Sequence, residues 1–207
     1  MAMNCTDKSK WNIIIKAIFS FVVGVACLFV IFLIIVTAIS SVEFHVTEAS
    51  LSKFNLTSNN TLSYKFEANI TLRNPNRDVQ VYYRKVTAIA WYKDHEFARV
   101  NLASFDQGHM NTTVLNVVFQ GKSFIKLKPK QLFKYNEETR LGIYNDLAID
   151  LELLIRYKYG IYKSYRFYPP TVQCRRLSLS LVSNGNTPSP PFHGRKCITD
   201  HFFTCYF

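Results

Sequence analysis

The last fifteen residues contain the spacing that most suggests chemistry. His193, Cys197, His201 and Cys205 recur every four residues. On a helix this spacing would line one face with two imidazoles and two thiols, which are donors that zinc accepts. Zinc sites seldom space all four ligands evenly, and cysteines outside the cytosol usually pair with one another. We therefore expect neither a metal nor another cofactor.

A disulfide is the expected fate of two of these thiols. Cys174, Cys197 and Cys205 lie in the C-terminal part of the chain, whereas Cys5 and Cys27 lie near its start. Three thiols permit one internal disulfide and leave one cysteine over. A Cys174–Cys197 bond would tie the proline-rich stretch 184–191 back to the last expected strand, and closing that loop would contribute about 3 kcal/mol.

Four triplets in the chain fit the acceptor pattern for N-glycosylation. They begin at Asn55, Asn59, Asn69 and Asn111. Each is an acceptor only if it faces the secretory lumen. Asn69 falls on the polar face of an expected strand, where we expect room for a glycan, and Asn55 and Asn59 are close enough to compete for one transfer. A fifth triplet at Asn4 should face the cytosol and stay unmodified.

Basic residues interleave with aromatic residues in two stretches. Such mixtures can bind nucleic acid, but a domain outside the cytosol does not meet it. The interpretation that we favour is an ordinary solvated sheet face, on which like charges deter edge pairing. The alternative is a binding site, for which cell-wall polyanions or an outer-leaflet surface would be the targets. The residues are Lys122, Lys126, Lys128 and Lys130 in the first stretch, and Arg156, Lys158, Lys163 and Arg166 in the second.

The chain carries no recognisable catalytic pattern. It has no glycine-rich phosphate loop and no Gly-x-Ser-x-Gly sequence. Both motifs are typical of common enzyme classes. His45, His95 and His109 are scattered, without partners that spacing identifies. We therefore expect no enzymatic activity.

A long apolar segment lies before the region in which we expect the folded domain. Residues 17–42 contain no charged side chain, and as a helix they would reach about 39 Å, enough to cross a hydrocarbon layer of about 30 Å. Lys8, Lys10 and Lys16 precede the segment and only Lys53 follows within 16 residues, which predicts a cytosolic N-terminus. A cleaved signal peptide is the alternative, although its apolar stretch would be shorter.

This gives three parts: a cytosolic tail at 1–16, a transmembrane anchor at 17–42 and an exterior domain at 43–207. Of the formal net charge of +11, +9 belongs to the exterior domain, because the first 42 residues hold three lysines and one aspartate. Such a surface attracts polyanions.

The exterior domain reads as short strands. Residues 64–73 alternate apolar and polar side chains, as a half-buried strand does, and Asn74-Pro75-Asn76 ends the run. Pro129 and Gly142 bracket a short helix at 131–141. Many short strands with frequent turns favour a β-sandwich. Further strands are expected at 79–83, 86–92, 113–119, 124–127, 150–159, 161–168 and 177–181, with 150–168 forming a hairpin around Gly160.

Several short runs occur in an order typical of a known family. They are Asn74-Pro75-Asn76, Tyr82-Tyr83, Gln107-Gly108-His109 and Asn111-Thr112-Thr113. With the membrane segment, they make the chain resemble the plant non-race-specific-disease-resistance and harpin-induced-like proteins, which carry a late-embryogenesis-abundant type 2 domain. Cys174 and Cys197 match a pair near that family's C-terminus. The family often has Asp after the paired tyrosines, where this chain has Arg84, and the Asn-Gly-Asp adhesion tripeptide of one branch is absent.

The resemblance implies a mainly β fold, an immunoglobulin- or fibronectin-like sandwich of about seven strands plus one helix. It implies a plasma-membrane protein that takes part in defence and stress responses and is not an enzyme, and the flanking charges predict a single pass in type II orientation. The expected partners are the membrane and other membrane or immune-signalling proteins, and the basic stretches predict a cell-wall polyanion as a second class. Nucleic acid is not among them.

Overall fold

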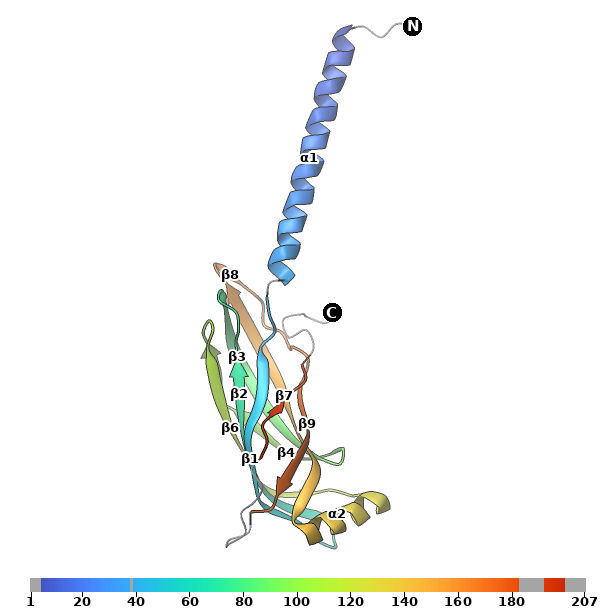
Figure 1. Ribbon diagram of the computed structural model, residues 1–207, viewed down its shortest axis with the longest axis vertical. Helices are drawn as coiled ribbons and strands as arrows, with labels where there is room; N and C mark the ends of the chain where they lie inside the picture. The colour runs from blue at the N-terminus through green and yellow to red at the C-terminus, as the bar shows by residue number, and fades with distance from the viewer. Residues whose placement is uncertain (1–4, 38, 183–191, 200–207) are drawn as a thin grey trace. The chain divides into compact units, whose positions relative to one another are not determined.

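The computed structural model describes residues 5–37, 39–182 and 192–199 (Figure 1). The chain divides into two compact units, Met1–Ser40 and Ser41–Phe207. The boundary falls just before the end of the apolar segment that the sequence delimits.

The first unit is one helix, α1 (Cys5–Thr37). Its apolar window Ile14–Ile31 is long enough to cross a membrane and carries no side chain buried against protein. Phe21 and Leu28, for example, are largely exposed. A helix that is apolar on every face suits lipid better than water. The helix starts before the predicted segment 17–42, and residues 39–42 lie outside regular structure.

The second unit consists of two antiparallel sheets and a short helix. One sheet has the order β10-β1-β2-β6; the other has the order β4-β3-β7-β8, with β5 paired to β3 and β9 paired to β7. The elements are β1 (Glu43–Leu56), β2 (Thr61–Arg73), β3 (Val79–Tyr92), β4 (His95–Leu102), β5 (Phe105–Gln107), β6 (Thr112–Phe124), α2 (Pro129–Leu141), β7 (Ile143–Tyr159), β8 (Tyr162–Lys163), β9 (Val172–Ser180) and β10 (Arg195–Lys196). The prediction of a mainly β fold is confirmed.

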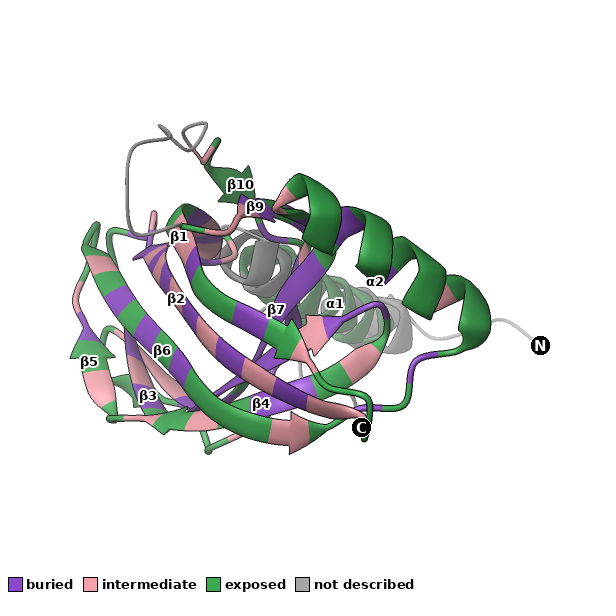
Figure 2. Cartoon of the chain, turned by 90° about the horizontal axis from the view of Figure 1, so that it is seen from below, coloured by how far each residue is buried: buried purple, intermediate pink, exposed green. Residues whose placement is uncertain are grey.

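Alternation along the strands places the core between the sheets (Figure 2). In β2 every second residue from Leu62 to Leu72 is buried, because successive side chains of a strand point to opposite faces. Phe66 stacks on Phe119 of β6 with ring centroids 5.5 Å apart. At the α2 end, the ring of Phe54 meets four aromatic rings, those of Tyr92, Phe97, Tyr135 and Tyr144.

Several predicted strand boundaries are wrong. β7 begins at 143 and β9 at 172, rather than at the predicted 150 and 177. The two strands expected at 79–83 and 86–92 are one strand, β3, with a register shift between Tyr83 and Lys85. A bulge of this kind inserts a residue without ending the strand, so the alternation breaks while the pairing continues. Likewise β6 runs to Phe124, and 125–127 leave the sheet. Of the stretch 161–168, only Tyr162–Lys163 pairs as a strand, followed by a bridge from Phe167 to Ile155.

The number of long strands and the position of the short helix agree with the expectation of about seven strands and one helix. Ten strands occur among the described residues, of which β5, β8 and β10 have three residues or fewer, leaving seven long ones. The predicted helix is α2. It has Pro129 at its first turn, and Gly142 caps its end at φ 69°, a left-handed conformation that favours glycine.

The second unit has two distinct ends. At the entry end, where the chain comes into the unit, Glu43 pairs with Arg73 and Val79 pairs with Tyr159. At the helix end, the Tyr135 hydroxyl of α2 accepts a hydrogen bond of 2.7 Å from the backbone N–H of Leu56.

Candidate anion-binding pocket

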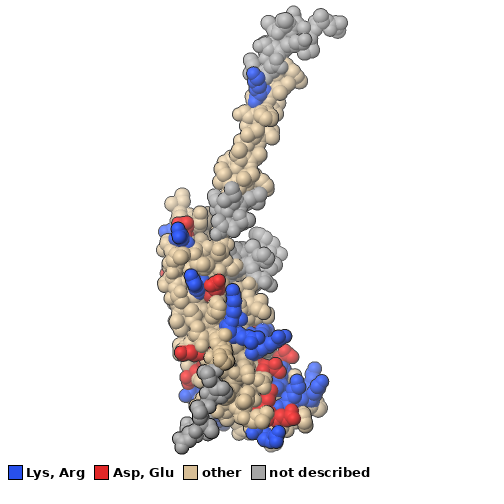
Figure 3. Space-filling model, viewed as in Figure 1, with Lys and Arg blue, Asp and Glu red and all other residues tan. Residues whose placement is uncertain are grey.

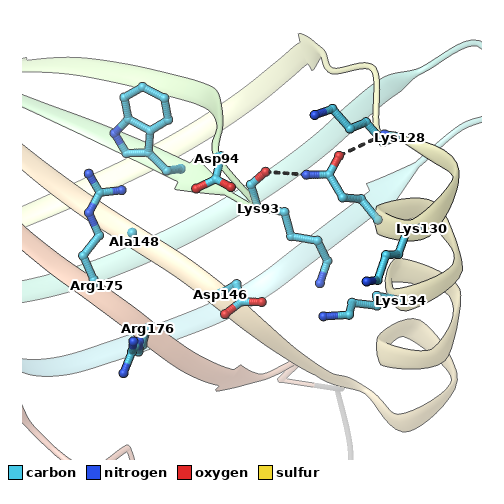
Figure 4. A pocket seen from close by; sticks show the side chains of 11 residues that line it. Lys93, Asp94, Lys128, Lys130, Lys134, Asp146, Ala148, Arg175 and Arg176 are labelled. Carbon is cyan, nitrogen blue, oxygen red and sulfur yellow. Dashed lines mark hydrogen bonds between the residues drawn. The ribbon is translucent and has the colours of Figure 1, made fainter.

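A pocket of about 640 Å³ opens at the helix end (Figure 4). Its walls come from the β3–β4 turn, the first turns of α2, the start of β7 and the middle of β9. Basic side chains dominate the walls, with two acidic ones between them. The basic residues are Lys93, Lys128, Lys130, Lys134, Arg175 and Arg176, and the acidic residues are Asp94 and Asp146.

Unusual backbone conformations shape this pocket. Lys93 and Asp94 form the two-residue turn between β3 and β4, with φ values of 47° and 67°. A tight hairpin turn of type I′ requires positive φ at both positions. Asp146 (φ 60°) and Arg176 (φ 58°) add two more. Four of the six non-glycine residues with positive φ in the described chain therefore line the pocket, and such residues tend to gather at functional sites.

A buried ion pair fixes α2 to the β3–β4 turn. The Lys93 ammonium lies 2.7 Å from Oε1 of Glu138, and the Tyr92 hydroxyl donates to Oε2 of the same carboxylate. The Gln131 side-chain amide donates to the Lys93 carbonyl at 2.9 Å and accepts from the Lys128 N–H at 2.9 Å. The helix start, and with it Lys130 and Lys134, is thus held against the turn. The charge of Lys93 is neutralised by Glu138.

A second carboxylate, that of Asp150, forms an ion pair with Arg175. Its guanidinium donates at 3.0 Å to Oδ2 of Asp150, which is buried, and it lies 6.0 Å from the centre of the Trp91 ring. Burial raises the pKa of Asp150, while the Arg175 charge and the Trp91 indole N–H act in the opposite direction. Because Asp150 already neutralises part of its charge, Arg175 should attract an anionic ligand less strongly than an unpaired arginine.

Four cations remain available to a ligand. Lys128, Lys130, Lys134 and Arg176 form no ion pair with any described residue. They outnumber Asp94 and Asp146, the acidic residues of the walls, so the pocket is positive overall. Clustered ammonium and guanidinium groups attract and hydrogen-bond carboxylates, phosphates or sulfates. Figure 3 shows Lys and Arg side chains gathered around α2.

The structure separates the two predicted basic stretches. Lys128 and Lys130 of the first stretch line the pocket, whereas Lys122 on β6 and Lys126 do not. The second stretch lies on and after the β7–β8 hairpin, at the entry end: Arg156, Lys158, Lys163 and Arg166. Sequence reasoning missed Lys93, Lys134, Arg175 and Arg176. The adjacent pair Arg175-Arg176 was a usable signal, but nothing in the sequence places it beside α2.

The family-motif residues form a buried network at the entry end. The Asn74 amide donates to the carbonyls of Val79 and Gly108 at 2.7 and 2.9 Å, and its oxygen accepts from the N–H of Asn76. The Gln107 amide donates to the Leu72 carbonyl at 2.8 Å and accepts from the Tyr83 hydroxyl at 3.2 Å. This network joins β2, β3 and β5, so these residues hold the two sheets together.

The remaining motif residues lie nearer the surface. Tyr82 is half-buried, and its hydroxyl donates to Gln80. Pro75 and Thr113 are half-buried as well, and His109 and Thr112 are exposed. Burial raises the pKa of the Tyr83 hydroxyl far above its ordinary value, which fits a hydrogen-bonding role inside the unit.

The four glycosylation triplets differ in their surroundings. Asn55, Asn59 and Asn111 are exposed. Asn69 is half-buried in the middle of β2, its amide donates to Glu48 at 2.7 Å, and its oxygen accepts from Asn116 at 2.9 Å. A glycan attached to Asn69 would replace one of its amide hydrogens, so this position has less room than its place on the polar face suggested.

A disulfide joins Cys174 of β9 to Cys197, which follows β10. The disulfide uses the thiol of Cys197, which would have been one of the four evenly spaced zinc ligands. Residues 195–196 form a short strand, so the spacing of His193 and Cys197 is not helical. Among the described residues no cluster of three or more His, Cys, Asp or Glu has a metal-binding arrangement. His201 and Cys205 lie outside the described residues.

Comparisons with known proteins agree with this fold and these motifs. The family model of the late embryogenesis abundant protein, type 2, matches residues 69–174. NDR1/HIN1-like protein 10 of Arabidopsis thaliana is 38% identical over 193 residues, covering 91% of this chain and 83% of the relative. NDR1/HIN1-like protein 3 of the same plant is 36% identical over 190 residues, covering 90% and 80%.

A solved structure of a protein from Archaeoglobus fulgidus aligns with 70% of this chain and 98% of its own, at 11% identity and a TM-score of 0.32. The sequence matches are far closer. They cover about nine tenths of this chain, the family model spans the residues of the buried amide network, and both agree with the resemblance that the short motifs carry. The chain therefore belongs to the late embryogenesis abundant type 2 family and, within it, to the NDR1/HIN1-like proteins.

Proposed function

We propose that this chain is a plasma-membrane protein that α1 anchors by a single pass, and that its second unit faces the cell exterior and acts there by binding rather than catalysis. Family membership supports a role in plant defence or stress responses. The observation that carries the anchoring is the apolar window Ile14–Ile31, which has no protein surface to cover it within its unit. The flanking lysines favour a cytosolic N-terminus.

Protease protection tests this topology. The full chain, tagged at each end, is expressed in plant cells, and protease is added to intact protoplasts. We expect the C-terminal tag to be lost and the N-terminal tag to survive until the membrane is opened with detergent. Survival of both tags on intact cells, or recovery of the chain in the soluble fraction after alkaline extraction, would contradict the proposal.

A second candidate function is a bridge from the membrane to an anionic cell-wall polymer. The four cations of the pocket that lack ion pairs favour it. The detergent-solubilised full chain should bind polygalacturonate with an affinity that falls as salt rises, because exposed charges are screened.

Charge reversals separate pocket binding from binding to the basic surface in general. Lys130→Glu with Lys134→Glu should weaken polygalacturonate binding by about tenfold or more, at about 1 kcal/mol for each lost contact. The matched control, Lys122→Glu with Lys126→Glu, changes the net charge equally but lies outside the pocket. Equal losses in both variants, or binding that ignores salt, would remove the pocket from this role.

A further inference from the structure

The tip of the β7–β8 hairpin, defined here as residues 157–168, presents apolar and aromatic side chains to solvent. Ile161 is fully exposed, Tyr165 is 93% exposed, and Tyr168 and Tyr162 are 66% and 57% exposed. In a soluble monomer, apolar groups gathered in this way mark a surface that meets a partner or a membrane. Tyrosine combines an apolar ring with a polar hydroxyl, which suits the boundary between lipid and water.

The tip is held in one shape. Gly160 takes φ 55° in the two-residue turn between the paired residues Tyr159 and Tyr162. The N–H of Ser164 donates to the Tyr157 carbonyl, and the Ser164 hydroxyl accepts from the Tyr157 N–H, both at 2.9 Å. The chain then returns to β7 where Phe167 bridges to Ile155. The exposed rings therefore stand on a supported turn.

The charges around the tip have one sign. Lys158, Lys163 and Arg166 alternate with the tyrosines, and no Asp or Glu occurs between Glu152 and Asp200. Lys and Arg can lay their methylene stems on apolar surface while their charged ends reach phosphate groups. The exposed isoleucine, the tyrosines and the cations are together the residue types that proteins place in the headgroup layer of a bilayer.

The tip also lies at the entry end of the second unit, the end from which the chain leads back to α1. Tyr159 pairs with Val79, the Val79 carbonyl accepts from Asn74, and the neighbouring Arg73 pairs with Glu43. Figure 1 shows β8 and the start of β1 at the same end of the second unit. Thr37, the last residue of α1, is only six positions before Glu43, a reach of about 20 Å at most.

We propose that the hairpin tip, residues 157–168, inserts into the phospholipid headgroup layer of the membrane that α1 crosses. This rests on the proposed anchoring. The docked tip gives the second unit a fixed orientation, with the entry end on the bilayer and the helix end, which holds the basic pocket, turned away from it. The pocket then faces ligands beyond the membrane.

Photo-crosslinking in nanodiscs tests the docking. The full chain is reconstituted in phosphatidylcholine nanodiscs with a photoreactive phenylalanine analogue in place of Ile161, Phe133 or Phe21. Phe133 on α2 is 65% exposed and serves as the helix-end control, and Phe21 in α1 reports on anchoring itself. We expect lipid adducts from position 161 to exceed those from position 133 by about tenfold, the preference that 1.4 kcal/mol of interfacial burial gives.

The outcomes separate the two ideas. Lipid adducts from position 21 with equal, low yields from 161 and 133 would overturn the docking and leave the anchor intact. No lipid adduct from position 21 would overturn the anchoring as well. Adducts from 161 that run at the mass of a protein partner would also overturn the docking. If the tip docks, Lys158→Glu with Lys163→Glu should lower the lipid adduct at 161 by about fivefold or more in nanodiscs that also contain anionic phosphatidylglycerol.

Discussion

Two amide side chains of the second unit are hydrogen-bonded where solvent does not reach them. Asn74 is fully buried and Gln107 is 1% exposed, yet the amide hydrogens and oxygens of both find partners. Buried polar groups of this kind stabilise one arrangement strongly, because any alternative leaves a donor or acceptor without a partner. The buried residues of the family motifs therefore have a structural explanation, which is that they join the two sheets.

Truncating Gln107 should destabilise the unit markedly. Gln107→Ala leaves the carbonyls of Leu72 and Asn111 without its amide and the Tyr83 hydroxyl without its acceptor. We expect the free energy of unfolding to fall by about 2–4 kcal/mol, measured by urea unfolding of the full chain in micelles. The control is Asn116→Ala, an exposed amide that donates to Asn69. A loss no greater than in this control would show that the network is dispensable.

Asp150 should make stability depend on pH in an unusual direction. Its pKa is raised from 3.8 in the folded chain, mainly by burial. The folded state then binds the proton more tightly than the unfolded state, so this group's contribution to stability falls as pH rises from about 4 through the raised pKa. In Asp150→Asn that decline is absent. The stability of the variant relative to the unsubstituted chain should therefore rise across this range, as melting temperatures can show, and a constant difference would contradict the assignment.

Among the elements, alternation along a strand could be read from the sequence and tertiary contacts could not. The pattern at 64–73 predicted β2 because one face of that strand is buried along its whole length. The same reasoning split β3 in two, because the exposed pair Arg84-Lys85 lies at the register shift, where the alternation breaks while the pairing continues. The helix α2 was predictable from Pro129 and Gly142. Its role was not, since the partner of Glu138 lies 45 positions earlier, at Lys93.

The Lys93–Glu138 pair should hold α2 in place. Both side chains are almost wholly buried, at 4% and 10% exposed. Glu138→Ala would leave the ammonium buried without a counter-charge, and we expect a loss of about 3–5 kcal/mol in the free energy of unfolding. Removing both charges, by Lys93→Met with Glu138→Gln, should recover most of that loss, because no ammonium is left without a counter-charge and the amide oxygen can still accept from the Tyr92 hydroxyl.

A surface ion pair provides the comparison. Lys65 and Glu67 lie 3.2 Å apart with both side chains more than 40% exposed, and Glu67→Ala should cost less than about 1 kcal/mol. Thermal unfolding of the three variants measures both effects. Equal costs for Glu138→Ala and Glu67→Ala would show that the buried pair does not anchor the helix.

At the scale of the whole molecule, the two basic stretches have different surroundings and different proposed tasks. The hairpin tip carries tyrosines and an exposed isoleucine, whereas the pocket combines lysines and arginines with two aspartates. The sequence revealed both stretches but not their separation to opposite ends. The pocket in particular draws Lys93, Lys130 and Arg175 from three different elements or turns, and no local pattern brings such residues together.

Glycan occupancy tests the orientation of the whole chain and the local surroundings at once. If the second unit faces the secretory lumen, treatment with a glycan-removing enzyme should increase the gel mobility of the chain made in plant cells. Asn111→Gln should reduce the size of that shift, because Asn111 is exposed. Asn55→Gln and Asn59→Gln should each have a smaller effect than the two together, since either site can serve in place of the other.

Asn69→Gln should leave the mobility unchanged. A glycan there would disrupt the hydrogen bonds of Asn69 to Glu48 and Asn116 on the outer face of β2, so chains that carry it should fold less stably and be removed. A shift in Asn69→Gln as large as in Asn111→Gln would contradict this account of the strand surface. Unchanged mobility of the unsubstituted chain after enzyme treatment would instead contradict the exterior orientation, because three exposed acceptor triplets would then have met no transferase.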